Sequence, residues 1–402
     1  MRVCFFNCTQ NGSTGSIVKS LAKHLLNNAN DVLCVFGKKT QNWGEIKCLF
    51  TIKNSVNKYF NKALARFDGR DGFINSNNTK KIIKEIQEFN PDIIHLHNMH
   101  GEWINMQLII KYAKANKIPI VMTLHDCWIA TGRCAHYSFV NCKKYLNGCG
   151  NCHHRLNYPK VYLLDRSKYY WKLKRKLLND IDLFFSPSNW LANEIYRSGI
   201  INEIQIIGNP YDDSVFFPLQ NEYPLPSKSK KTIGFCSFVW DESKGLSMAQ
   251  EIAKHYLKRN FNVVFVGLSE KDKRLPNGAK GIAKTNNREE LANLYRSFDV
   301  FVNTTKQDNF PTVNLEALAC DTPVVVAKVG GSYEMLKDEL ANGVVKDYTL
   351  KSFISKIDYY LNKEVFKTPE SFSYYKPKLF GERTLYFYGK IISKYNNGNK
   401  TK

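Results

Sequence analysis

The segment KTIGFCSF at residues 231–238 opens a series in which short apolar runs alternate with helical patterns. The apolar runs that follow it are NVVFVGL (262–268), FDVFVN (298–303) and TPVVVA (322–327). Helical patterns lie between them at 246–259, 287–297 and 312–320. Repetition of strand and helix in this way predicts a parallel sheet with helices on both faces.

A similar series occupies the first half of the chain. Its expected strands are RVCFF (2–6), DVLCVF (31–36), DIIHLH (92–97), IPIVMTLH (118–125) and IDLFFSPS (181–188), with helical patterns at 16–26 and 81–89. Prolines, serines and polar residues at 209–230 are typical of a linker. The fold class is therefore α/β, with two doubly wound, Rossmann-like domains.

We expect the first domain at 1–208, with an aperiodic, cysteine-rich insertion at 127–160, and the second at 231–370. Residues 371–402 are expected to form a C-terminal helix that packs back on the first domain. In open α/β sheets ligands bind beyond the carboxyl ends of the strands, so two facing domains would place a site in the cleft between them.

Composition restricts the class of protein further. The chain has 402 residues, 43% of them hydrophobic, which excludes a disordered protein. Its apolar runs are shorter than a membrane-spanning helix requires, and the N-terminal apolar stretch breaks too early for a signal peptide. We expect a cytoplasmic location, where the eleven cysteines would not form disulfides. A net charge of +22 indicates an anionic partner.

Glycines mark the first junction between strand and helix, in the sequence NGSTGSIVKSL from Asn11 onward. Gly12, Ser13 and Gly15 would let the backbone approach a ligand closely, and the helix N-terminus would offer free N–H groups to an anion. The pattern is not the GxGxxG of dinucleotide-binding proteins. A plain turn with Ser13 or Thr14 as the helix cap remains an equal alternative.

The segment TTKQDNFPTVNLEALACDTPVVVAKVGGSYEML (304–336) carries more chemical information. Glu316 lies within an expected helix and could accept two ribose hydroxyls, and Asp308, in the loop before it, could meet a sugar ring. Backbone amides at the start of that helix could bind phosphate. Lys244, in WDESKGL, could neutralise a diphosphate. Taken singly, each of these charges would be an ordinary surface residue.

Together these motifs resemble the retaining glycosyltransferases of family 4, which have the two-domain GT-B fold. The resemblance extends along nearly the whole chain and is greatest to the bacterial branch that builds capsule, O-antigen or exopolysaccharide. The motifs that carry it are NGSTGSI (11–17), PDIIHLHNMHGEWIN (91–105), TLHDCWIATGRC (123–134), SPSNWLA (186–192), NPYDDSVFFP (209–218), ESKGL (242–246) and DNFPTVNLEALACDTPVVV (308–326).

The resemblance implies a role for each matching residue. His125 would contact the transferred sugar, Lys244 would hold the diphosphate, and Asp308 would face the sugar where most of the family has Glu. The glycine loop and the segment around Asn309, Phe310 and Thr312 would bind the nucleotide sugar, and Glu316 its ribose. An arginine that many members carry shortly before the lysine is absent, because Phe238, Val239 and Trp240 occupy that stretch.

The activity that this resemblance implies is transfer of a hexosyl group from a nucleotide-diphosphate sugar, UDP- or GDP-linked, with retention of configuration. The acceptor would be a saccharide, expected to be lipid-linked, and no catalytic metal would be required. A non-catalytic scaffold or sugar-binding member of a polysaccharide assembly is the alternative function. A nucleic-acid-binding protein is disfavoured because it would leave the glycine loop and the Asp308–Glu316 segment unexplained.

Four cysteines in the insertion have the spacing C-x₇-C-x₆-C-x₂-C. They are Cys134, Cys142, Cys149 and Cys152. Such a set could enclose a structural zinc ion, with His136, His153 or His154 as substitute ligands. Free or buried thiols, and disulfides, are the other possibilities. Cys127 is expected to be a thiol packed in the core. His95 is expected to be a buried histidine with a hydrogen bond, whereas His97 and Asn98 could face the acceptor.

The positive charge is concentrated in three stretches. Residues 155–176 hold eight basic side chains and one acid, 376–402 hold seven and one, and 53–70 hold five and one. The first and third also carry aromatic residues, as do basic helices that lie on anionic lipid. A peripheral site on the inner face of the cell membrane is one interpretation, and solvated helices in a lysine-rich chain are the other.

Overall fold

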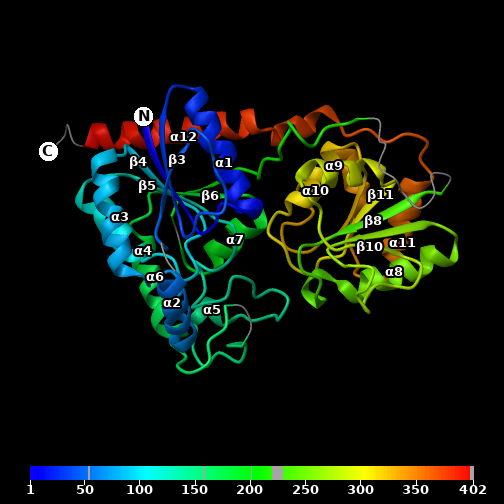
Figure 1. Ribbon diagram of the computed structural model, residues 1–402, viewed down its shortest axis with the longest axis horizontal. Helices are drawn as coiled ribbons and strands as arrows, with labels where there is room; N and C mark the ends of the chain where they lie inside the picture. Colours follow the sequence, from blue (N-terminus) through cyan, green and yellow to red (C-terminus); the bar gives the residue numbers. More distant parts are fainter. Residues whose placement is uncertain (53–54, 157–158, 201, 220–229, 399–402) are drawn as a thin grey trace. The chain divides into compact units, whose positions relative to one another are not determined.

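The computed structural model describes residues 1–52, 55–156, 159–200, 202–219 and 230–398. The chain divides into two compact units (Figure 1). Unit 1 consists of Met1–Gly208 with the C-terminal segment from Lys378, and unit 2 is Asn209–Pro377. Among the described helices, none is long and apolar enough to cross a bilayer.

Unit 1 is built on a seven-stranded sheet in the order β3-β2-β1-β4-β5-β6-β7, in which every neighbouring pair is parallel. Its strands are β1 (Arg2–Asn7), β2 (Asp31–Phe36), β3 (Lys47–Phe50), β4 (Ile93–Leu96), β5 (Ile120–Thr123), β6 (Leu183–Ser186) and β7 (Ile204–Ile206). Its helices are α1 (Gly12–Asn27), α2 (Ser55–Asp68), α3 (Ser76–Phe89), α4 (Met106–Ala115), α5 (Lys144–Asn147), α6 (Ser167–Leu178), α7 (Asn189–Arg197) and most of α12 (Pro377–Gly398). The order reverses between β1 and β4, and ligands bind beside such a switch point.

Unit 2 contains a six-stranded parallel sheet in the order β10-β9-β8-β11-β12-β13. Its strands are β8 (Thr232–Cys236), β9 (Asn262–Val266), β10 (Lys280–Ile282), β11 (Val300–Asn303), β12 (Val324–Ala327) and β13 (Val344–Val345). The helices are α8 (Leu246–Lys258), α9 (Arg288–Ser297), α10 (Thr312–Ala319) and α11 (Leu350–Leu361), with 3-10 turns η1 (Glu242–Lys244), η2 (Asp338–Gly343) and η3 (Glu370–Tyr375). Here the switch point lies between β8 and β11.

Helix α12 joins unit 1 through its own side chains. Tyr388 is fully buried, and its hydroxyl forms a hydrogen bond with the ring of His95 in β4. The Tyr395 hydroxyl donates to Asp182, just before β6, at 2.6 Å. The last described helix of the chain is therefore part of the core of unit 1.

Every strand predicted from an apolar run is present, and the predicted α/β class with two Rossmann-like, parallel sheets is confirmed. Residues 209–219, within the expected linker, pack instead into unit 2, because Tyr211 and Phe216 are buried in its core. Residues 220–229 lie outside the described residues. Within the basic stretch 155–176, helix α6 begins at Ser167.

Candidate functional site

In unit 2, loops after the two central strands bring Lys244 and Asp308 together. Lys244 ends the turn η1 after β8, and Asp308 lies between β11 and α10. The Lys244 Nζ is 2.8 Å from the Asp308 Oδ2, and both side chains are partly exposed. A cation and a carboxylate are thus placed at the switch point of the sheet, where an anionic ligand and a sugar could both be held.

The backbone fixes the position of Lys244. Gly245 has φ +73°, and a Cβ there would lie 1.9 Å from the carbonyl oxygen of Thr304, so only glycine fits. The Thr304 hydroxyl donates to the carbonyl of Lys244 at 3.1 Å, and the Lys306 amide donates to Ser243 at 2.9 Å. The loops after β8 and β11 are therefore hydrogen-bonded to each other at Lys244 and the residue before it.

The segment after Asp308 turns into helix α10. Asn309 and Phe310 are buried, and Thr312 is the first helical residue. Pro311 precedes it as the cap residue and offers no side-chain hydrogen bond to the helix. Pro311 therefore leaves the first backbone amides of α10 without a side-chain cap. Uncapped amides of this kind are what an anion-binding helix N-terminus uses.

Glu316 lies inside α10 and is 8% exposed. Its Oε1 is 3.6 Å from the Arg288 guanidinium, and the Tyr295 hydroxyl donates to its Oε2 at 3.5 Å. Burial raises the pKa of Glu316, and the positive charge of Arg288 opposes that rise. A buried carboxylate held by weak, long contacts retains acceptor capacity for hydroxyl groups of a ligand.

In unit 1, the glycine loop forms the turn from β1 into α1. Gly12 is the first residue of α1 with φ +75°, Ser13 is exposed, and Gly15 is buried. A Cβ on Gly15 would lie 2.2 Å from the carbonyl oxygen of Gln10, so glycine is required for the tight turn. The cap residue Asn11 makes no side-chain hydrogen bond to the helix, which leaves the first amides open to a ligand.

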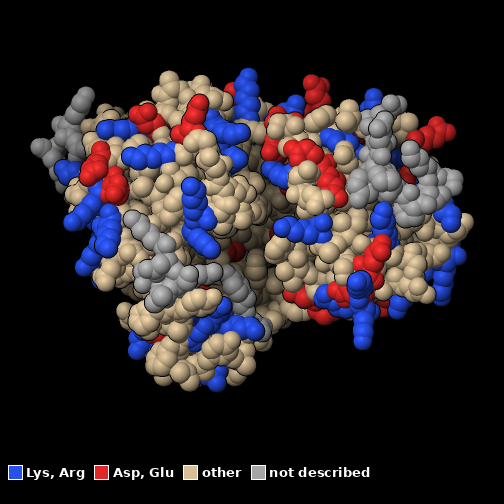
Figure 2. All heavy atoms as spheres, in the orientation of Figure 1, with Lys and Arg blue, Asp and Glu red and all other residues tan. Residues whose placement is uncertain are grey.

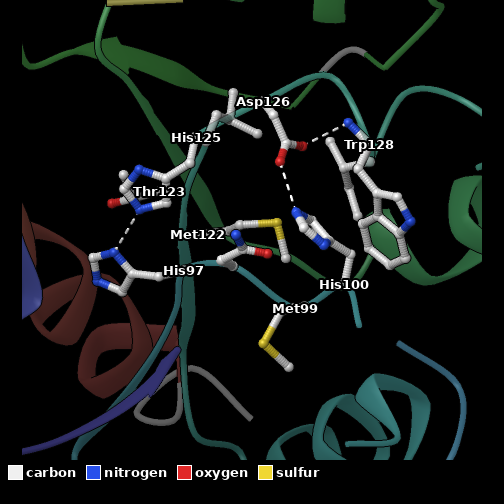
Figure 3. Close-up of a pocket in the computed structure, with 11 residues that line it drawn as sticks. His97, Met99, His100, Met122, Thr123, His125, Asp126 and Trp128 are labelled. Carbon is white, nitrogen blue, oxygen red and sulfur yellow. Dashed lines mark hydrogen bonds and ion pairs between the residues drawn. The ribbon is translucent and has the colours of Figure 1, made fainter. Parts of the chain in front are cut away.

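His125 follows β5 and is hydrogen-bonded to His97, which follows β4. The His97 Nδ1 and the His125 Nε2 are 2.9 Å apart, and Figure 3 shows the two rings joined at one side of a pocket. Burial lowers the pKa of His125 to about 4 despite the opposing charge of Asp126, so the ring is neutral near pH 7. The Nε2 of His97 and the Oδ1 of Asn98 are buried without a hydrogen-bond partner among the described residues.

The same pocket contains a second pair that the sequence did not point to. The His100 Nε2 is 2.9 Å from the Asp126 Oδ2, and the Trp128 amide donates to the Asp126 Oδ1 at 2.8 Å (Figure 3). Burial raises the pKa of Asp126, but the charge and hydrogen bond of His100 outweigh it and lower the pKa to about 2. Asp126 is therefore an anion that orients the loop carrying His125.

His95 has the buried, hydrogen-bonded position that the sequence predicted. Its Nε2 is 2.8 Å from the Thr123 hydroxyl, and its Nδ1 is bonded to Tyr388. Both ring nitrogens are thereby satisfied inside unit 1, and burial lowers the pKa of the ring well below its usual value. Cys127 is likewise a buried core thiol, as expected.

The four cysteines of the insertion lie on either side of the short helix α5, with Cys134 and Cys142 before it and Cys149 and Cys152 after it. The Gly132 amide donates to the Cys149 Sγ at 3.1 Å, and the Arg133 Nη1 is 3.8 Å from the Cys152 Sγ. Cys134 donates a hydrogen bond to Cys152, which lowers the pKa of the Cys152 thiol. All four are free thiols.

Two buried basic side chains lie beside these sulfur atoms. Arg133 is 3% exposed, and Lys174 is fully buried, with its Nζ donating to the Trp128 carbonyl at 2.5 Å. Among the described residues, which include all four cysteines, no group of three or more His, Cys, Asp or Glu is arranged so that it could hold a metal ion. Zinc binding by Cys134, Cys142, Cys149 and Cys152 stays a prediction.

The residues that were not predicted from the sequence are the ones that contact the carboxylates of the candidate site, Glu316 and Asp126. Arg288 begins α9, and Tyr295 lies two turns later, so neither is near Glu316 in the sequence. His100 is close to Asp126 only because β4 and β5 are neighbours in the sheet. The pair of His100 and Asp126 depends on β4 and β5 being neighbours in the sheet, an order that was not predicted, and the Arg288 contact carries no sequence signal.

Comparison with known proteins agrees with this architecture. Residues 14–215 match Glycosyltransferase Family 4, and residues 230–363 match the group described as Glycosyl transferases group 1. A putative colanic acid biosynthesis glycosyl transferase, WcaC of Escherichia coli K12, is 25% identical over 309 residues, which are 72% of this chain and 73% of that protein.

Solved structures show the same fold. A glycosyltransferase from Rickettsia africae ESF-5 superposes with a TM-score of 0.67 at 16% identity, covering 97% of this chain and 98% of its own. Anabaena Alr3699/HepE in complex with UDP superposes with a TM-score of 0.65 at 14% identity, covering 97% and 100%. The chain therefore has the GT-B fold and belongs to Glycosyltransferase Family 4.

Proposed function

We propose that this glycosyltransferase moves a hexosyl group from a nucleotide-diphosphate sugar to a saccharide acceptor, with retention of configuration. The observation that carries the proposal is the pairing of Lys244 with Asp308 at 2.8 Å, beside a helix that holds the buried Glu316. The proposal is supported because a cation, a carboxylate that could face a sugar and, in the helix that follows, a carboxylate that could accept ribose hydroxyls match the three parts of such a donor.

Each donor part has a matching group in unit 2. The Lys244 ammonium would neutralise the diphosphate, the first amides of α10 would donate to its oxygens, and Glu316 would accept the ribose hydroxyls. Asp308 would face the sugar. Binding of UDP by the Anabaena structural neighbour supports a uridine nucleotide, and GDP is the alternative.

In the proposed reaction, the bond between the sugar C1 and the diphosphate oxygen breaks as the acceptor oxygen bonds to C1 from the same face. The acceptor proton passes to the departing diphosphate. Charge separates between an oxocarbenium-like sugar and the leaving group, so the positive charge of Lys244 and the amide dipoles lower the barrier. No catalytic metal is part of this proposal.

On the side of unit 1, His125 would contact the transferred sugar. Its neutral ring, held by His97, could exchange a hydrogen bond with a sugar hydroxyl without carrying charge. The unpartnered His97 Nε2 and Asn98 Oδ1 would be satisfied by hydroxyls of the bound saccharide, because buried polar atoms without partners are costly.

We propose surface-polysaccharide synthesis as the setting, in capsule, O-antigen or exopolysaccharide, and a lipid-linked acceptor. The support is the similarity to WcaC, whose name assigns it to colanic acid biosynthesis. Such an acceptor places the enzyme at the cytoplasmic face of the membrane, as a peripheral protein. A structural zinc in the cysteine-rich insertion is also proposed, on the sequence spacing of the four cysteines alone, and its binding would require these side chains to move closer together than the described residues place them.

The test is a transfer assay with radiolabelled UDP- and GDP-sugars and lipid extracts that contain saccharide acceptors. Wild type should convert a donor to labelled glycolipid, and Lys244→Ala and Glu316→Ala should each lose most of that transfer. Donor binding without transfer would support the non-catalytic scaffold. If both variants transferred sugar as wild type does, the proposed site would be wrong.

A further inference from the structure

The pocket of unit 1 combines polar groups with a wall of aliphatic side chains. It lies at the carboxyl ends of β4 and β5 and has about 290 Å³ of empty space, open solvent included. Such a volume is at the lower end for small-molecule sites, so one sugar ring fits it better than an oligosaccharide does. Four of the side chains that line it form what we name the aliphatic wall: Met99, Met122, Leu124 and Ile129.

The aliphatic wall is part of the core of unit 1. Its four side chains are no more than 5% exposed, and all of them belong to one hydrophobic cluster. Figure 3 shows Met99 and Met122 between the two hydrogen-bonded pairs of the pocket that are described above. A ligand that extends from one polar pair toward the other would therefore contact the methionine side chains.

Trp128 holds the aliphatic wall in place. A Cβ on Gly72 would lie 2.7 Å from the indole ring, so the ring packs directly on that glycine, and the Lys174 Nζ is 3.8 Å from the ring centroid. The next residue, Ile129, is thereby held in the lining of the pocket. A preorganised wall of this kind binds a matching ligand without the cost of ordering its side chains.

The polar side of the pocket has two atoms that lack a hydrogen-bond partner. The His97 Nε2 and the Asn98 Oδ1 are buried without one among the described residues, whereas the His97 Nδ1 is 2.9 Å from the His125 Nε2. Hydroxyl groups of a sugar ring could satisfy both atoms, since buried polar groups without partners are costly. The pocket is therefore complementary to a ligand with hydroxyls on one side and an apolar group on the other.

The aliphatic wall distinguishes between kinds of sugar. A hydroxymethyl group against the wall would lose its hydrogen bonds to water and gain at most a weak one from a methionine sulfur. A methyl group in the same place would be stabilised by removal of its apolar surface from water. A 6-deoxyhexose, which carries a methyl group on carbon 5 and keeps its ring hydroxyls, therefore matches both sides of the pocket.

Two other classes of sugar fit the pocket less well. An acidic sugar would need a cation, but many basic side chains of unit 1 lie on its surface (Figure 2), and none of the described residues that line the pocket is Lys or Arg. The charged lining residue Asp126 is an anion. An acetamido sugar would bring an N–H and a carbonyl in addition to its hydroxyls, which are more polar groups than the two unpartnered atoms can satisfy.

We propose that this pocket holds a 6-deoxyhexose at the end of the saccharide acceptor, with its methyl group against the aliphatic wall and its ring hydroxyls at His97 and Asn98. The pocket belongs to unit 1, whereas the groups assigned to the donor, Lys244, Asp308 and Glu316, belong to unit 2. The inference rests on the proposed function, since it names the acceptor sugar of that reaction. Binding is measured without a donor, so failure of the inference would leave the proposed glycosyl transfer untouched.

The test is a ligand-observed NMR titration of the full-length protein with methyl glycosides, in pairs that differ only by the oxygen on carbon 6. The pairs are methyl α-L-fucoside and α-L-galactoside, methyl α-L-rhamnoside and α-L-mannoside, and methyl β-D-quinovoside and β-D-glucoside. In at least one pair, wild type should bind the 6-deoxy glycoside with a Kd at least about tenfold lower than that of the hexoside, because only the hexoside buries an unpaired hydroxyl.

The variant Met99→Gln places an amide in the aliphatic wall at nearly the same side-chain length. The amide would give the hydroxyl on carbon 6 a partner, so the preference for the 6-deoxy glycoside should shrink to about twofold or less. The matched control Met106→Gln changes another buried methionine of unit 1 that does not line the pocket, and it should keep the wild-type preference. Thermal melting shows whether each variant folds, and the wild-type comparison depends on neither variant.

Several results would overturn the proposal. They are no binding of any 6-deoxy glycoside, binding of the hexoside at least as tightly in every pair that binds, and an unchanged preference in folded Met99→Gln. Methyl N-acetyl-β-D-glucosaminide bound more tightly than every 6-deoxy glycoside, and weakened in Met99→Gln, would assign the pocket to an acetamido sugar instead. Preferred binding of a 6-deoxy glycoside by a protein that transfers no sugar would support the ligand of the pocket and contradict the proposed transfer.

Discussion

Replacing Lys244 by Met should weaken binding of a nucleoside diphosphate while leaving the fold intact. The substitution keeps the length of the side chain and removes only its charge. In the structure, the Lys244 Nζ is 2.8 Å from Asp308, with 36% and 23% of the two side chains exposed. Without the lysine, the Asp308 carboxylate would also face the phosphates unneutralised.

The expected magnitudes separate binding from stability. An exposed ion pair contributes only about 0–1 kcal/mol to folding, so the melting temperature of Lys244→Met should fall by no more than about 3 °C. A charge-assisted contact to a diphosphate contributes about 1.5–3 kcal/mol. At about 1.4 kcal/mol per factor of ten, Kd should rise roughly ten- to hundredfold.

The assay is isothermal titration calorimetry with UDP and with GDP, alongside thermal melting of each variant. The matched control is Lys114→Met in unit 1, another exposed lysine in an ion pair, at 3.8 Å from Asp180. The control should bind the nucleotide as wild type does. Unchanged affinity in Lys244→Met, or a loss of affinity explained by unfolding, would refute the assignment of the diphosphate site.

Three further predictions concern unit 1. The amide group of an Asn side chain can take the position of the His97 Nδ1, which contacts His125, and that of a Gln side chain cannot. His97→Asn should therefore keep more of the kcat for sugar transfer than His97→Gln does, with KM little changed. Equal loss of kcat in both variants would contradict positioning of His125 through the His97 Nδ1. Burial lowers the pKa of His95, His97 and His125, so the unfolded chain binds protons that the folded chain does not as pH falls below 6.5. The free energy of unfolding, measured by urea titration, should therefore fall between pH 7 and pH 5 by up to about 1.4 kcal/mol per pH unit for each ring. A flat profile would exclude this linkage. Elemental analysis of protein purified without chelator should find one zinc per chain, lost when the four cysteines of the insertion are replaced, and its absence would leave them as free thiols.

Most of the sheet could be predicted because buried parallel strands are nearly continuous apolar runs. The expected 31–36 coincides with β2, and 92–97 contains β4. The strands that were missed lie at or near sheet edges: β3 begins with a lysine, and β10 is three residues long with a central glycine. Such short, partly exposed strands lack an apolar signal of their own.

The candidate site could be predicted only where a motif carried it. Lys244, Asp308 and Glu316 were predicted from motifs, but the 2.8 Å contact between the first two depends on the adjacency of β8 and β11. The contact of Arg288 with Glu316 depends on how α9 packs beside α10. Contacts set by packing between distant elements cannot be derived from a local pattern.

The central claim is that Glu316 receives the ribose of a nucleotide donor. The most direct measurement compares the calorimetric Kd of wild type and Glu316→Gln for UDP and for 2′,3′-dideoxy-UDP. Wild type should bind UDP at least about a hundredfold more tightly than the dideoxy compound, because two hydrogen bonds to a carboxylate at about 1.5 kcal/mol or more each are lost. The variant should discriminate far less. Equal affinity of wild type for both nucleotides would show that Glu316 does not hold the ribose.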